Sequence, residues 1–63
     1  MTLIQAQQRY IDRVTRCHPG HQRRVRKAAW AELFKWAEAR GMDGKAICQD
    51  ANDMASLEQA SDE

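Results

Sequence analysis

Two interruptions divide an otherwise helical sequence pattern, and they constrain the architecture that this chain can adopt. The first is His18-Pro19-Gly20-His21 and the second is Gly41. Proline disfavours helical geometry in the residue before it, and glycine commonly follows the last residue of a helix. No stretch alternates apolar and polar residues with a period of two, so nothing favours a strand. The sequence therefore predicts an all-α fold with helices at about 2–17, 22–40 and 44–59.

The first predicted helix begins with a recognisable start signal. Thr2 followed three residues later by Gln5 is a capping-box pattern. After it, apolar residues recur at spacings of three and four, which indicates an amphipathic helix. Because the connection to the second helix is short, we expect the first two helices to form an antiparallel hairpin.

The second predicted helix carries an unusually wide apolar face. Its apolar residues fan over roughly half of the circumference at about 100° per residue: they are Val25, Ala29, Trp30, Leu33, Phe34, Trp36 and Ala37. A helix packed against one neighbour needs a narrower stripe, so we expect cover on two sides. Trp36 is the aromatic residue that we assign to the core.

The third predicted helix has weaker signals. Asp43 is a suitable N-cap, but Ile47, Ala51, Met54 and Ala55 give only a thin apolar line. We therefore expect a shorter and looser third helix, with residues 60–63 as a frayed tail.

The length of the chain limits the core that it can build. Sixty-three residues make a single domain, 1–63, and a chain of this size buries only about 60% of its unfolded surface. Together with the wide apolar face of the second helix, this predicts a homodimer with Trp30, Leu33 and Phe34 at the interface.

Charge is divided by position along the chain. Residues 1–27 hold seven Lys or Arg against one acid, and residues 28–63 hold three against eight, so a total of +1 conceals halves of about +6 and −5. Such asymmetry points to an electrostatic partner. Arginine and aromatic residues dominate binding hot spots, and our candidate partner-binding residues are Arg9, Arg13, Arg16, Arg23, Arg24, Arg26, Lys27, Trp30 and Phe34.

These features favour a small, non-enzymatic adaptor or regulator that binds an acidic or apolar surface of another protein. The alternative is a nucleic-acid-binding protein that uses the basic turn from Arg16 to Lys27 to neutralise phosphates. Ala37, Gly41 and Ile47 also match a helix-turn-helix pattern, but the helix that would read DNA carries Asp50, Asp53 and Glu58, which repel a polyanion.

Cysteine and histidine residues raise the question of a metal or a catalytic site. The predicted fold separates Cys17 from Cys48 by a central helix about 27 Å long, which excludes a shared intrachain metal or disulfide. Cys17, His21 and Cys48 could meet only between two chains of an antiparallel dimer. A Cys17 nucleophile with His21 as base would lack a group to orient the histidine and an oxyanion site. We therefore expect no enzyme activity, no metal and no cofactor.

The sequence contains no apolar run long enough to span a membrane and no signal-peptide pattern. We expect a cytoplasmic protein with reduced cysteines and no membrane association, of the compact accessory kind common in bacteria and phages.

Overall fold

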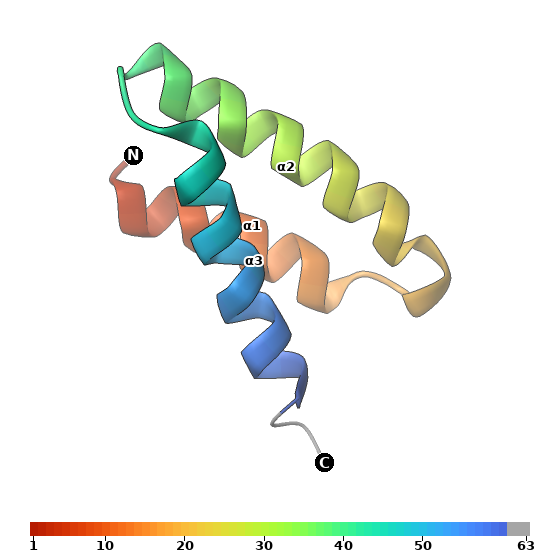
Figure 1. Ribbon diagram of the computed structural model, residues 1–63. Coiled ribbons are helices and arrows are strands. Elements are labelled where there is room, and N and C mark those ends of the chain that lie inside the picture. Colours follow the sequence, from red (N-terminus) through yellow and green to blue (C-terminus); the bar gives the residue numbers. More distant parts are fainter. Residues whose placement is uncertain (61–63) are drawn as a thin grey trace.

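The computed structural model describes the backbone of residues 1–60 and the side chains of residues 1–57. It contains helix α1 (Leu3–Arg16), a short 3₁₀ turn η1 (Pro19–His21), helix α2 (Gln22–Ala39) and helix α3 (Gly44–Ala60) (Figure 1). Residues 1–60 include no strand, so the all-α prediction is confirmed. Of the frayed tail expected at 60–63, Ala60 is the last residue of α3, and residues 61–63 lie outside the described residues.

Local hydrogen bonds explain where α1 and the following turn begin. The Thr2 hydroxyl oxygen accepts from the Gln5 backbone N–H at 3.2 Å, and the Gln5 side-chain oxygen accepts from the Thr2 N–H at 3.0 Å. This is the predicted capping box, and it satisfies two donors that would otherwise lack partners. At the other end of the helix, the His18 Nδ1 accepts from the Gly20 N–H at 3.0 Å and caps η1.

The second break is a complete Schellman motif. Gly41 has a φ of 74°, its N–H donates to the Glu38 carbonyl at 3.0 Å, and the Met42 N–H donates to the Ala37 carbonyl at 2.9 Å. The Asp43 carboxylate then accepts from the Ala46 N–H at 3.3 Å, which confirms Asp43 as the N-cap of α3. The chain therefore leaves α2 and enters α3 within a few residues.

All three helices contribute to one core. α2 packs against both α1 and α3, so the predicted two-sided cover is achieved within a single chain. In Figure 1, α1 and α2 are joined at residues 17–21 and α3 crosses the pair. The buried core residues are Ala6, Tyr10, Ile11, Val14, Ala29, Leu33, Ala37, Ile47, Cys48, Ala51 and Ala55.

The expectation of a looser α3 is wrong, and α3 is shorter than α2 but longer than α1. α3 has 17 residues and α1 has 14, and Cys48, Ala51 and Ala55 of α3 are fully buried. Small side chains allow the helix to approach the other two closely, so a thin apolar line is sufficient for tight packing. Met54, which we had placed in that line, is 39% exposed.

Candidate partner-binding site

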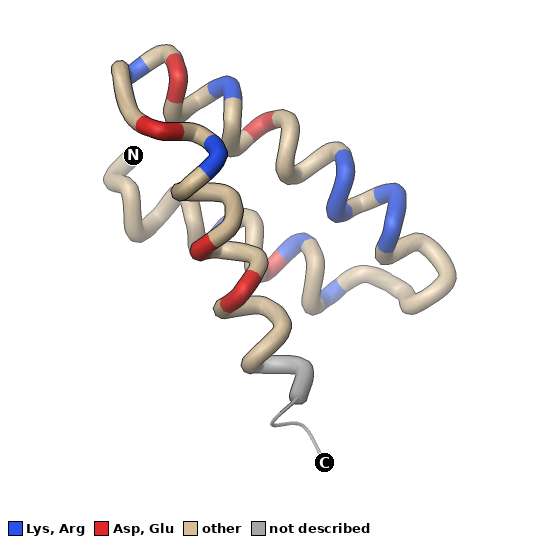
Figure 2. The backbone as a smooth tube through the Cα atoms, viewed as in Figure 1, with Lys and Arg blue, Asp and Glu red and all other residues tan. Residues whose placement is uncertain are grey.

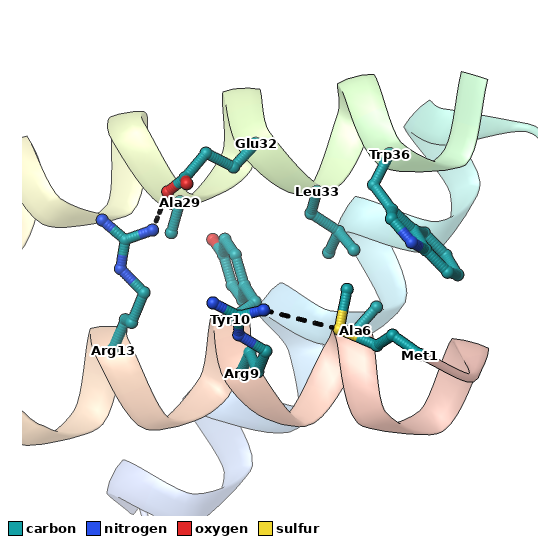
Figure 3. Close-up of a pocket in the computed structure, with 9 residues that line it drawn as sticks. All are labelled: Met1, Ala6, Arg9, Tyr10, Arg13, Ala29, Glu32, Leu33 and Trp36. Atoms are coloured by element: carbon teal, nitrogen blue, oxygen red, sulfur yellow. Dashed lines mark hydrogen bonds and ion pairs between the residues drawn. The ribbon is translucent and has the colours of Figure 1, made fainter. Parts of the chain in front are cut away.

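A groove runs between α1 and α2 (Figure 3). It encloses about 220 Å³ and is partly open to solvent. Helix α1 supplies residues at positions 6, 9, 10 and 13, and α2 supplies residues at 29, 32, 33 and 36. These spacings of three and four place each set on one side of its helix. The lining residues are Met1, Ala6, Arg9, Tyr10, Arg13, Ala29, Glu32, Leu33 and Trp36.

The floor of the groove is apolar because core residues form it. Ala6, Tyr10, Ala29 and Leu33 are each at most 5% exposed. Ala6 on α1 and Ala29 on α2 end at Cβ, so neither side chain extends to fill the space between the helices. The groove is therefore a place where small residues leave a gap over a well-packed core.

Charged side chains line the rim of the groove. Arg13 of α1 forms an ion pair with Glu32 of α2, and the two side chains are 44% and 66% exposed, so the pair contributes little to stability. Arg9 donates to the Met1 sulfur at 3.6 Å. Among the described side chains Arg9 has no carboxylate partner, so it is available to an external acid.

Trp36 lies at one end of the groove. Its ring is partly buried against the core, and the guanidinium carbon of Arg40 lies 4.8 Å from the ring centroid on the ring face. This cation–π contact and the partial burial hold the indole in place. Sequence reasoning assigned Trp36 wholly to the core and therefore missed it as a groove residue.

Tyr10 ties the groove floor to α3. Its hydroxyl donates to the Asn52 side-chain oxygen at 3.1 Å, and its ring lies edge-on to Trp30 with centroids 6.4 Å apart. Burial raises the pKa of Tyr10, with the positive charge of Arg26 acting in the opposite direction and Cys48 adding to the increase. The phenol is therefore neutral over the physiological range and serves as a fixed structural donor.

Cys48 lies in the same region of the core. Its thiol is fully buried and donates to the Trp30 carbonyl at 3.5 Å. Burial raises the pKa of this thiol, which keeps it protonated at neutral pH. A protonated, enclosed thiol is a poor nucleophile.

A second charged region, the basic end, surrounds the α1–α2 turn (Figure 2). It consists of Arg16 from α1 and Arg23, Arg24, Arg26 and Lys27 from α2. All except Arg26 are exposed, and none forms an ion pair with another described residue. Arg26 is half-buried, and its Nε has no hydrogen-bond partner within the part of the chain that the structure describes. By contrast, α3 carries Asp50 and Asp53 on its exposed surface.

The predicted partner-binding residues thus divide into separate places. Arg9 and Arg13 line the groove, whereas the other five cations form the basic end. Trp30 is half-buried beside Tyr10. Phe34 lies on the α2–α3 side, where its ring and carbonyl approach Gly44.

The residues that we assigned to a dimer interface do not form one exposed surface in the single chain. Leu33 is only 5% exposed and belongs to the core. Trp30 is partly buried against that core, and Phe34 is exposed. Dimerisation stays a prediction, although the second cover that α2 needs is already provided by α3.

The cysteine and histidine side chains make separate local contacts rather than sharing one site. His18 and His21 have ring centroids 5.9 Å apart, and the Cys17 thiol donates to the Val14 carbonyl at 3.2 Å. Cys17 and Cys48 are both free thiols. No three His, Cys, Asp or Glu side chains among the described residues are grouped to hold a metal ion.

Comparisons with protein-family models, with curated proteins and with solved structures gave no match to this chain. Across residues 1–60, no helix has both the length and the apolar character needed to cross a bilayer.

Proposed function

We propose that this chain is a small, non-enzymatic module that binds another protein through its α1–α2 groove and its basic end. The observation that carries the proposal is the combination, in one groove, of an apolar floor, a fixed indole and an arginine that has no carboxylate partner among the described side chains. Aromatic and arginine side chains are the residue types that dominate protein-binding hot spots.

The size of the groove supports a protein partner over a small-molecule substrate. Small-molecule and cofactor sites occupy about 300–1,000 Å³, and the groove encloses about 220 Å³. That volume suits one or two protruding side chains of a partner. The raised pKa of Cys48 further disfavours a nucleophilic role for that thiol.

A capture experiment tests this proposal. The chain is immobilised, exposed to lysate of its native host after nuclease treatment, and the retained proteins are identified and purified. We expect a purified partner to bind the wild-type chain directly, and more slowly after Arg23, Arg24 and Lys27 are changed to Glu, because surface charge acts mainly on the association rate. The triple variant should stay folded, since acidic residues are favoured in the first turns of a helix. The proposal would be contradicted if none of the captured proteins, once purified, bound the chain directly.

The antiparallel hairpin and the homodimer are parts of the same proposal. Phe34 is the exposed member of the proposed interface, and it lies on the α2–α3 side rather than in the groove. A dimer makes the melting temperature rise with protein concentration. A concentration-independent melting temperature, with a 7.3 kDa particle in light scattering, would exclude it.

Nucleic-acid binding is a second candidate, favoured by one observation. The cations of the basic end gather around one turn and have no ion-pair partner among the described residues. If this region neutralises phosphates, the chain will retard DNA at about 50 mM salt and release it by about 200 mM, and the triple variant will not bind. Absence of retardation at low salt would remove this candidate.

A further inference from the structure

The α1–α2 pair has two faces, and α3 covers only one of them. On the covered face, the Gln7 side chain of α1 donates to the Ile47 carbonyl of α3 at 3.2 Å. From α2, the Trp30 carbonyl accepts from the Cys48 thiol. The groove opens on the other face, with α3 behind it in Figure 3. A further helix could therefore lie against the pair opposite α3.

The charges on the uncovered face select an acidic occupant. Arg9 and Arg13 belong to consecutive turns of α1, on the same rim. The partner of Arg13 is the largely exposed Glu32, and the contact of Arg9 is a thioether, which is a weak acceptor. A carboxylate from a partner would replace that weak contact with a charge-assisted hydrogen bond.

A second copy of the chain fits this face poorly. A two-fold interface places the same patch on both subunits. The charged lining of the groove is Arg9, Arg13 and Glu32, so two copies would bring four arginines together with only two carboxylates, and this surplus of positive charge is unfavourable. Charge complementarity therefore points to a different chain.

We propose that the groove binds an amphipathic acidic helix of a partner protein, on the face opposite α3. A large apolar side chain of that helix enters the gap above Ala6 and Ala29, and a Glu or Asp one turn away pairs with Arg9. Two neighbouring helices with a gap between them suit the helix-in-groove mode of recognition. This inference rests on the proposed function and names the partner chemistry of its groove.

The probe for this inference is a synthetic amphipathic helix of about 15 residues, or about four turns, with Leu on one face and Glu on its flanks. Two matched peptides serve as controls: in one every Leu is Gln, and in the other every Glu is Lys. Binding is followed by NMR of the ¹⁵N-labelled chain. The two indole N–H signals are convenient reporters, since Trp36 lines the groove and Trp30 packs edge-on against Tyr10 without lining it.

We expect the acidic Leu peptide to shift the Trp36 indole signal and the amides around Arg9, with smaller changes at Trp30. Arg9→Glu should weaken this binding about tenfold or more, which corresponds to about 1.4 kcal/mol. Lys45→Glu is the matched control, because it makes the same charge change at an exposed position of α3 that belongs neither to the groove nor to the basic end. It should weaken binding by less than about threefold, since exposed charges at a distance are screened.

Three outcomes would overturn the inference: no binding of the acidic Leu peptide, equal binding of the Lys peptide, or shifts confined to the basic end with the Gln peptide binding equally well. In the last case the chain still binds an acidic peptide through its charged surface, so protein binding at the basic end survives as part of the proposed function while the groove assignment fails. Conversely, if a purified partner is captured but Arg9→Glu leaves its affinity unchanged, only the groove assignment is refuted.

Discussion

Gly44→Ala is the substitution whose effect follows most directly from the packing. Gly44 is the first residue of α3 and is buried against α2. A Cβ at this position would lie 2.9 Å from the Phe34 Cδ2 and 3.1 Å from the Phe34 carbonyl oxygen. The first distance is too short for a real contact, and the second involves backbone that cannot move without disturbing α2.

Two effects of opposite sign determine the magnitude. In open space, replacing a helical glycine by alanine stabilises by about 0.4–1 kcal/mol, because it restricts the unfolded chain. Forcing an extra methyl group into a packed site costs about 1–3 kcal/mol. The Phe34 ring can swing outward, since it is already 39% exposed, but its carbonyl remains in place. We therefore expect Gly44→Ala to lower the free energy of unfolding by about 0.5–2 kcal/mol.

Chemical denaturation followed by far-UV circular dichroism measures this change. For a domain of this size, a loss of about 1 kcal/mol lowers the melting temperature by about 4–8 °C. Phe34→Ala provides the matched background, because it removes the ring and leaves the carbonyl. There Gly44→Ala should cost less, and the difference gives the coupling between the two residues. A Gly44→Ala variant more stable than the wild type, or an equal cost in both backgrounds, would refute the reasoning.

Three further changes have expected outcomes that denaturation experiments can check. Gly41→Ala should cost about 1–2 kcal/mol because Gly41 has a φ of 74°. The cost is purely one of backbone conformation, because no atom of the described residues lies within 4 Å of the added Cβ; an unchanged denaturation midpoint would contradict this. Thr2→Ala should cost about 0.5–2 kcal/mol through loss of the capping box. Amide exchange rates in the first turn of α1 that equal those of the wild type would argue against it. The free energy of unfolding should fall as the pH rises above about 9. Burial raises the pKa values of Tyr10 and Cys48, so both groups lose their protons at lower pH in the unfolded chain than in the folded one. This contribution to the free energy of unfolding is fully present below the pKa values that the two groups have in the unfolded chain, and it is lost as the pH rises through their pKa values in the folded chain. The decrease in stability with pH should therefore be smaller in Tyr10→Phe, and it should be absent if neither group is buried.

Much of the fold was predictable from sequence because its signals are local. The capping box at Thr2 and Gln5 and the αL glycine at 41 act within one turn of the chain, so their residue types are sufficient to identify them. The three helices follow from these signals and from apolar spacing. The unequal distribution of charge is also visible in the sequence, and the cations of the basic end lie near one another because they flank one short turn.

The arrangement of surfaces depended on packing between helices, which sequence spacing does not reveal. The wide apolar face of α2 predicted two-sided cover, but only the tertiary structure shows that α3 provides one of the two sides. The same packing buries Leu33 and leaves Trp36 beside an open groove. The gap depends on Ala6 and Ala29, which are 23 residues apart in sequence and lie on the facing sides of two helices. The sequence by itself determined where each helix begins and ends, since caps and periodicity are local. Only the tertiary structure decided which apolar and charged side chains share a surface, since that depends on how small residues let helices approach one another.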